Sequence, residues 1–191
     1  MQSIAKNDQV ELTAELAREA GSLRIHYTLE NRTADELYLT ARTKLDGQDL
    51  RRPYTVFRAA DSAIVLSYVM CPPPPRVEIY APHMASSVKV AAHATYRDIA
   101  EVKIPIEEMH PYSAPAYPRD LVTVEVSKLV FLTEYVMGKD TKFVRALEDP
   151  KGFYRAGGSP QPRLELHFEL DSPIAILKRT GVFYRCYPAM A

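Results

Sequence analysis

The sequence predicts an all-β protein, an antiparallel β-sandwich, on three observations. Apolar and polar residues alternate with a period of two through most of the chain, as in strands with one buried face. Turn-forming residues separate these segments at short intervals. No interior segment of the 191 residues shows a convincing helical period. An immunoglobulin-like arrangement is the favoured architecture, and a jelly roll or a partly open barrel is the alternative.

The first two predicted strands form a hairpin. Residues 10–17 alternate between apolar and polar side chains, which predicts a strand. A helix is the alternative, because Asp8 and Glu11 could form a capping box and Gly21 could end the helix. We prefer the strand, because the next strand follows at once and residues 18–21 then serve as the turn.

The second strand of this hairpin has the clearest alternation in the chain. Its apolar side chains should face the core and its polar ones the solvent, since a slip by one residue would bury the charges. The apolar set is Leu23, Ile25, Tyr27 and Leu29, and the polar set is Arg24, His26, Thr28 and Glu30. Residues 23–31, with the turn that follows, are similar to the early strands of bacterial immunoglobulin-like modules.

Later segments predict further strands, a bend and a loop. The segment 121–136 changes phase at residues 127–128, which indicates a β-bulge or a bend between sheets. Glycines and prolines in residues 147–162 predict a mobile loop. Other strands are predicted at residues 37–41, 54–58, 64–70, 77–80, 88–92, 99–106, 164–170, 174–177 and 182–187.

Residues 164–172 repeat the pattern of residues 23–31. Two tandem domains would explain the repeat, but the region after Pro118 predicts only about four strands, too few for an independent sandwich. We therefore expect one domain, 1–191, with two strands in similar surroundings.

The charge balance and the lack of long apolar segments exclude several classes of partner. Lys plus Arg is 24 and Asp plus Glu is 24, so the chain lacks the basic excess typical of proteins that bind nucleic acid. No apolar run approaches the roughly 20 residues that span a bilayer, and no signal peptide opens the chain. We expect a cytoplasmic protein that binds neither nucleic acid nor membranes, with Cys71 and Cys186 reduced.

Two proline-rich segments carry the candidate binding residues. One combines three prolines with His110, Tyr112 and Tyr117, and tyrosines on a stiff loop are favoured interface anchors. The other is the run of prolines at 72–75, an extended polyproline II segment to which Arg76 adds a charge for docking. The structural alternatives are a loop that lies flat on the sandwich and a stiff connector between strands.

Catalytic chemistry has weaker support in the sequence. His83, His93 and His110, with Glu107 and Glu108, are ligand types that suit zinc, iron or copper. Glu107 and His110 have a spacing that puts two ligands on one helix face, but Pro105 and Pro111 limit a helix there to one turn, and no His-x-His pair exists. The chain also has no nucleophile elbow or phosphate-binding glycine loop. We therefore assign no catalytic residue, no metal ligand and no cofactor.

These observations favour a non-catalytic protein-binding or assembly module over an enzyme. Its contacts, to a protein partner or to copies of itself in an oligomer, would run through loops or through an edge strand. The alternative is a metal-dependent enzyme that uses the His/Glu cluster. A third hypothesis is a small-molecule or carbohydrate binder in which tyrosines form the aromatic platform.

Overall fold

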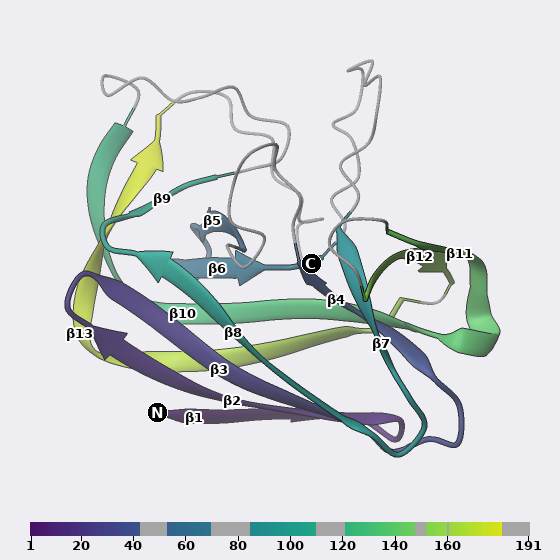
Figure 1. Ribbon diagram of the computed structural model, residues 1–191. Helices are drawn as coiled ribbons and strands as arrows, with labels where there is room; N and C mark the ends of the chain where they lie inside the picture. The colour runs from purple at the N-terminus through teal and green to yellow at the C-terminus, as the bar shows by residue number, and fades with distance from the viewer. Residues whose placement is uncertain (43–52, 70–84, 110–120, 148–151, 160, 181–191) are drawn as a thin grey trace.

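The computed structural model describes residues 1–42, 53–69, 85–109, 121–147, 152–159 and 161–180 (Figure 1). Most of these residues lie in strands and none lies in an α-helix, which confirms the predicted all-β class. The strands form two open sheets. Between the sheets runs one hydrophobic cluster that extends from Val10 to Ile176.

The first sheet contains the predicted hairpin. Its strands, in the order β1-β2-β3-β8, are β1 (Gln2–Lys6), β2 (Val10–Glu19), β3 (Ser22–Asn31) and β8 (Thr95–Lys103). All three pairings are antiparallel, and the strand interpretation of residues 10–17 is confirmed. Gly21 in the β2–β3 turn has φ = 82°, a conformation that glycine adopts without strain. The sequence did not predict β1, which is short and only partly buried.

The second sheet is larger and is built around one long strand. In spatial order it contains β11 (Thr141–Ala146), β12 (Phe153–Gly158), β7 (Ser86–Val90), β4 (Leu37–Arg42), β10 (Leu121–Met137), β13 (Arg163–Arg179) and β9 (Ile106–Glu107). Strand β6 (Ala63–Ser67) also pairs with β10, and β5 (Tyr54–Arg58) pairs with β6. Two of these pairings, β6 with β10 and β9 with β13, are parallel, so the prediction of a purely antiparallel structure is wrong there.

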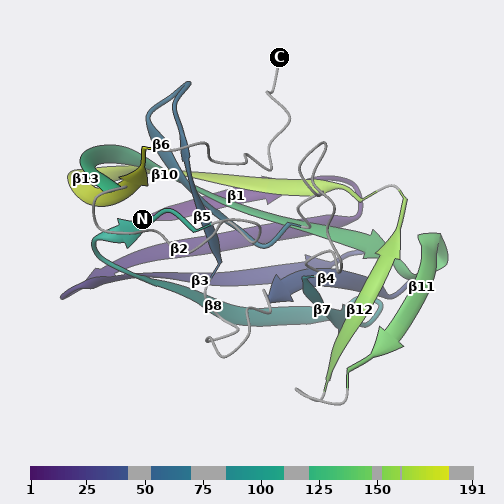
Figure 2. The ribbon, with the colours of Figure 1, turned by 90° about the horizontal axis from the view of Figure 1, so that it is seen from above.

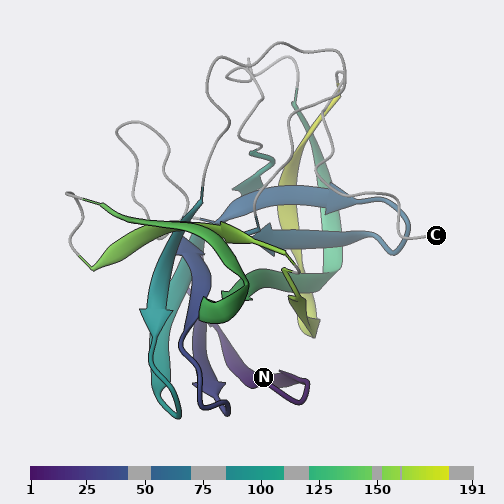
Figure 3. The ribbon, with the colours of Figure 1, turned by 90° about the vertical axis from the view of Figure 1, so that its right-hand side faces the viewer.

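Strand β10 pairs with three other strands of the second sheet, β13, β6 and β4. It pairs with β13 along most of its length, and a register shift between Val126 and Lys128 confirms the predicted bulge. Beyond this bulge, residues 128–132 also pair with β6, and the last residues of β10 pair with β4. In Figure 3 the blue β5–β6 hairpin and the green β11–β12 hairpin therefore extend to opposite sides of the molecule.

The face assignment for β3 is confirmed. Ile25 and Leu29 have no exposed surface, and Tyr27 is 2% exposed and lies 5.1 Å from the Phe131 ring of β10, between ring centroids. On the opposite face His26 is exposed, and the other polar side chains are exposed or half-buried. The apolar alternation of β3 therefore supplies one side of the contact between the two sheets.

The predicted loop over residues 147–162 is wrong at residues 153–158, which form a strand. Residues 153–158 form β12, which pairs with β11 on one side and with β7 on the other. The strand lacks an alternating pattern because its residues are half-buried on both faces, apart from the buried Gly157. Strand β11 was not predicted at all, because five of its six residues are exposed and neither face imposes an apolar period.

The two strands predicted at 164–170 and 174–177 are parts of one strand, β13. Its residues 170–173 lie between the pairs Lys128–Glu169 and Val126–Ile174, so they have no partner in the ladder with β10. Proline is tolerated where the ladder needs no N–H donor, which explains Pro173 inside a continuous strand. The strands predicted at 77–80 and 182–187 lie outside the described residues.

The buried face of β3 makes a direct prediction for stability. Ile25→Ala should lower the free energy of unfolding by about 2–5 kcal/mol, because it leaves a cavity in a fully buried site. His26→Ala, one residue away on the exposed face, should change it by less than about 0.5 kcal/mol. Denaturant unfolding of both variants measures the difference, and equal effects would contradict the face assignment.

Candidate functional site

The residues predicted to bind a partner, Arg76, His110, Tyr112 and Tyr117, lie outside the described residues. Their assignment stays a prediction, as do the redox states of the two cysteines. The site must therefore be sought elsewhere in the structure.

The described members of the proposed His/Glu cluster do not lie together. His93 is exposed in the turn before β8, whereas Glu107 and Glu108 follow the other end of that strand. Nine residues of strand separate the two ends by about 30 Å. Within the described part of the chain, no three His, Cys, Asp or Glu side chains come together as a metal-binding group.

Glu108 has a structural role that the sequence did not reveal. Its side chain is buried, and its two carboxylate oxygens accept hydrogen bonds from the backbone N–H groups of Phe57 at 2.6 Å and Arg179 at 2.8 Å. The neighbouring Met109 forms an antiparallel bridge with Thr55. Glu108 thus joins β5 to the end of β13, and its carboxylate is already occupied.

This role predicts a difference between two adjacent glutamates. Glu108→Ala should destabilise the protein by at least about 2 kcal/mol, because two backbone N–H groups in a buried site lose their acceptor. Glu107→Ala should cost less than about 1 kcal/mol, since the one ion pair of this half-exposed side chain with a described residue is a 3.6 Å contact with Arg179. Denaturant unfolding compares the two variants. Similar losses would show that Glu108 does not hold these strands together.

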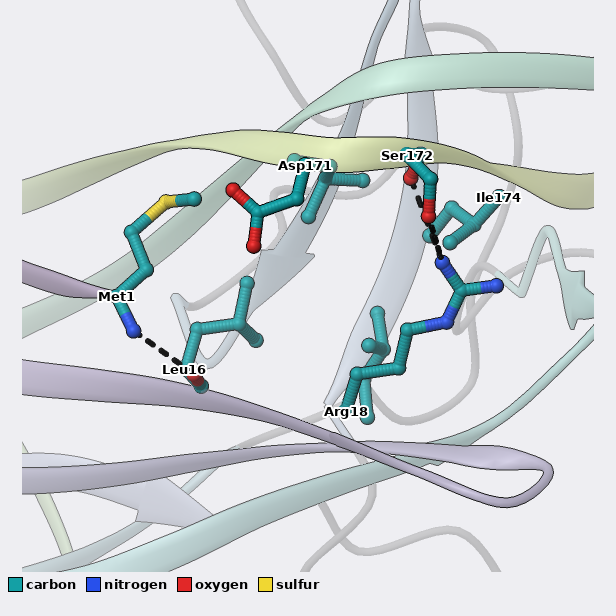
Figure 4. Close-up of a pocket in the computed structure, with 8 residues that line it drawn as sticks. Met1, Leu16, Arg18, Asp171, Ser172 and Ile174 are labelled. Atoms are coloured by element: carbon teal, nitrogen blue, oxygen red, sulfur yellow. Dashed lines mark hydrogen bonds between the residues drawn. The ribbon is translucent and has the colours of Figure 1, made fainter.

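A small cavity of about 170 Å³ lies where the first sheet meets β13 (Figure 4). Its wall includes Leu16 and Arg18 of β2 and the stretch of β13 that leaves the β10 ladder. Arg18 Nη1 donates a hydrogen bond of 2.6 Å to the hydroxyl of Ser172, so this contact joins the two sheets. The cavity is smaller than the roughly 300–1,000 Å³ of typical ligand pockets. We interpret it as a packing gap at the sheet junction.

The outer strands of the two sheets differ in what they present to a partner. Strand β8 turns Asp98 toward the interior side, where it accepts a hydrogen bond from the Tyr96 hydroxyl, and an inward-facing charge protects an edge from added strands. Strand β9 has only two residues. Strand β1 exposes one large apolar side chain of its own, Ile4.

Strand β11 is the most accessible edge among the described strands. It is the outermost strand of the second sheet, as Figure 2 shows at its right-hand side. Phe143 is 48% exposed and Val144 is 40% exposed, and adjacent residues of a strand point to opposite faces. The edge therefore offers apolar surface on both faces.

The direction of the backbone groups of β11 follows from one hydrogen bond. The N–H of Leu147 donates to the carbonyl of Phe153 at 2.8 Å, so residue 147 faces β12. Backbone groups alternate in direction along an antiparallel strand, and the register is regular from Phe143 onward. Arg145 therefore also faces β12, whereas the N–H and C=O groups of Val144 and Ala146 point away from the sheet. These four polar groups have no strand beside them in the described residues.

Glycine shapes the inner side of this hairpin. Gly157 lies opposite Phe143, and a Cβ atom there would be 2.6 Å from the Phe143 ring. A Cβ atom on Gly158 would be 2.2 Å from the carbonyl oxygen of Asp140. The absence of both side chains lets β11 and the preceding turn pack closely on β12.

Side chains of β4 and β7 anchor β12 to the rest of the sheet. The Tyr38 ring of β4 meets the Tyr154 ring of β12 edge to face at 5.5 Å. Glu36 accepts hydrogen bonds from the Lys89 ammonium and the Tyr38 hydroxyl, and these lower the pKa of its carboxyl group. Burial, followed by the hydrogen bond to Glu36, raises the pKa of Tyr38. Strand β11 therefore pairs with a strand, β12, that is itself packed against β4.

The two strands of this hairpin carry only positive charge, whereas the sequence between them contains Glu148, Asp149 and Lys151. Strands β11 and β12 contain Lys142, Arg145 and Arg155 and no acidic residue. Arg145 and Arg155 are direct partners in the antiparallel register. None of the three cations forms an ion pair with a described residue.

Comparisons with known proteins leave the geometry as the guide to function. No family model matches the chain, and no similar curated protein or solved structure was found. Within the described ranges, no helix is both long and apolar enough to cross a membrane.

Proposed function

We propose that this protein is a non-catalytic binding or assembly module, and that an extended segment of its partner adds as a strand to the free edge of β11. The observation that carries the proposal is the combination on this edge of outward backbone groups with exposed Phe143 and Val144. Backbone hydrogen bonds would supply affinity and the two apolar side chains would supply contact area.

The proposal also covers the type of sandwich, an alternative contact surface and the location of the protein. Two sheets around a shared core support a sandwich, and we propose an immunoglobulin-like version, from which the parallel pairing of β6 with β10 is a departure. The loop with Tyr112 and Tyr117 is the alternative contact surface. A cytoplasmic location, with no nucleic-acid or membrane partner, fits the balanced charge of the chain.

Two substitutions at Val144 separate backbone recognition from side-chain recognition. Val144→Pro removes an N–H group that points away from β12, so the hairpin should survive while an added strand loses a hydrogen bond and meets the proline ring. Val144→Ala truncates the same side chain but keeps the N–H group. Peptides selected from a random ten-residue display library on the unaltered protein should bind Val144→Pro at least about tenfold more weakly. They should bind Val144→Ala more tightly than Val144→Pro, because Val144→Ala loses contact area but keeps the backbone hydrogen bond.

Circular dichroism and thermal unfolding of both variants check that the sheet is intact. If the selected peptides bind the proline variant as tightly as the unaltered protein, the edge of β11 is not the binding surface. A library that yields no binder also contradicts the proposal.

A further inference from the structure

We infer that the strand added to β11 is acidic, and that a carboxylate on it binds the paired guanidinium groups of Arg145 and Arg155. The inference rests on the proposed function and names the chemistry of the partner. Its starting point is the cross-strand pair of like charges formed by Arg145 and Arg155.

Arg145 and Arg155 are held together by the backbone. The Leu147–Phe153 hydrogen bond makes the pair two residues earlier, Arg145–Arg155, a hydrogen-bonded pair with Cα atoms about 5.5 Å apart. Direct cross-strand partners point to the same face, and like charges in this arrangement destabilise a sheet. A carboxylate placed beside both side chains would remove that repulsion.

Several arginines in the described residues have acidic partners, although Arg18 of β2 and Arg97 of β8 have none there. Arg24 lies 2.8 Å from Glu19, Arg32 lies 2.6 Å from Glu11 and Arg58 lies 2.7 Å from Asp61, measured between nitrogen and oxygen. Arg145 and Arg155 have no such partner among the described residues. The cross-strand pairing of these two cations is the feature that a carboxylate on an added strand would neutralise.

A second copy of the chain fits this edge poorly. If two β11 strands paired antiparallel with full overlap of residues 143–147, the central pair would be Arg145 against Arg145 of the copy. Each would also remain beside its own Arg155. That register would gather four guanidinium groups on one face, so charge favours a different, acidic strand.

An acidic residue opposite Arg145 would satisfy both arginines. It would share the face of Arg145 as its direct partner, and Arg155 would lie two strand spacings away, about 10 Å between backbones. Extended arginine and glutamate side chains bridge that span, and guanidinium–carboxylate hydrogen bonds are strong and directional. The residues on either side would meet Val144 and Ala146, where β-branched side chains are favoured.

The test compares two peptides that differ by one charge. The first has the central sequence Thr-Val-Glu-Val-Thr between Gly-Ser flanks, with blocked ends and a fluorophore. The second replaces the glutamate with glutamine, which keeps shape and hydrogen-bonding capacity. Fluorescence anisotropy should show the glutamate peptide binding at least about tenfold more tightly at about 0.05 M salt. At about 0.5 M salt the preference should fall below about threefold.

Charge-removal variants locate the preference on the hairpin. The double variant Arg145→Gln, Arg155→Gln should bind the two peptides equally. Arg97→Gln is the matched control, because it removes an exposed arginine from β8, on the other sheet, and should keep the preference. Thermal unfolding should show Arg145→Gln at least as stable as the unaltered protein, since it relieves a like-charge pair. A clear loss of stability would overturn the claim that the two arginines repel.

The outcomes separate the inference from the proposed function. Equal binding of both peptides by the unaltered protein, still weakened by Val144→Pro, would overturn the acidic partner but leave strand addition standing. No binding of either peptide, or binding that ignores Val144→Pro, would overturn both. Tighter binding of a single-stranded oligonucleotide than of the glutamate peptide, insensitive to Val144→Pro, would show that the arginine pair serves nucleic acid instead.

Discussion

The antiparallel pairing of β10 with β13 holds the second sheet together. Both strands have 17 residues, and β10 also pairs with β6 and β4. Strand β10 therefore joins the β5–β6 hairpin to the strands β4, β7, β12 and β11. At the bulge in β10, residues 170–173 of β13 have no partner on β10. Ser172 in that stretch accepts a hydrogen bond from Arg18 of the first sheet. The same pairing therefore sets both the shape of the second sheet and its junction with the first.

The two sides of the second sheet differ in how their outer strands are held and covered. On the side of β5 and β9, the buried carboxylate of Glu108 binds backbone N–H groups of Phe57 and Arg179 and fixes the strands that meet there. On the other side the sheet continues through β4, β7 and β12 and ends at β11, with outward backbone groups and two exposed apolar side chains. One side is closed by internal hydrogen bonds, whereas the other ends at an edge that no described strand covers.

Burial on one face decides how much of this could be predicted from the sequence. The β2–β3 hairpin was predicted correctly because its inner residues are buried and its outer ones are not, which produces a period of two. Strand β11 was missed because adjacent Phe143 and Val144 are both exposed, so no alternation arises. Thr-Lys-Phe-Val-Arg-Ala still has a β-branched and aromatic centre, the signal that could have indicated a strand. The role of Glu108 depends on Phe57 and Arg179, which are distant in sequence, so no local pattern reveals it.

Residue-resolved amide hydrogen exchange, measured by NMR on the unliganded protein, tests the open edge of β11 most directly. The amides of Val144 and Ala146 should exchange rapidly, whereas those of Arg145 and Leu147 should be protected by their hydrogen bonds to β12. On addition of the glutamate peptide, Val144 and Ala146 should become protected as well. Protection of Val144 and Ala146 in the unliganded monomer would show that this edge is already covered and would contradict the account.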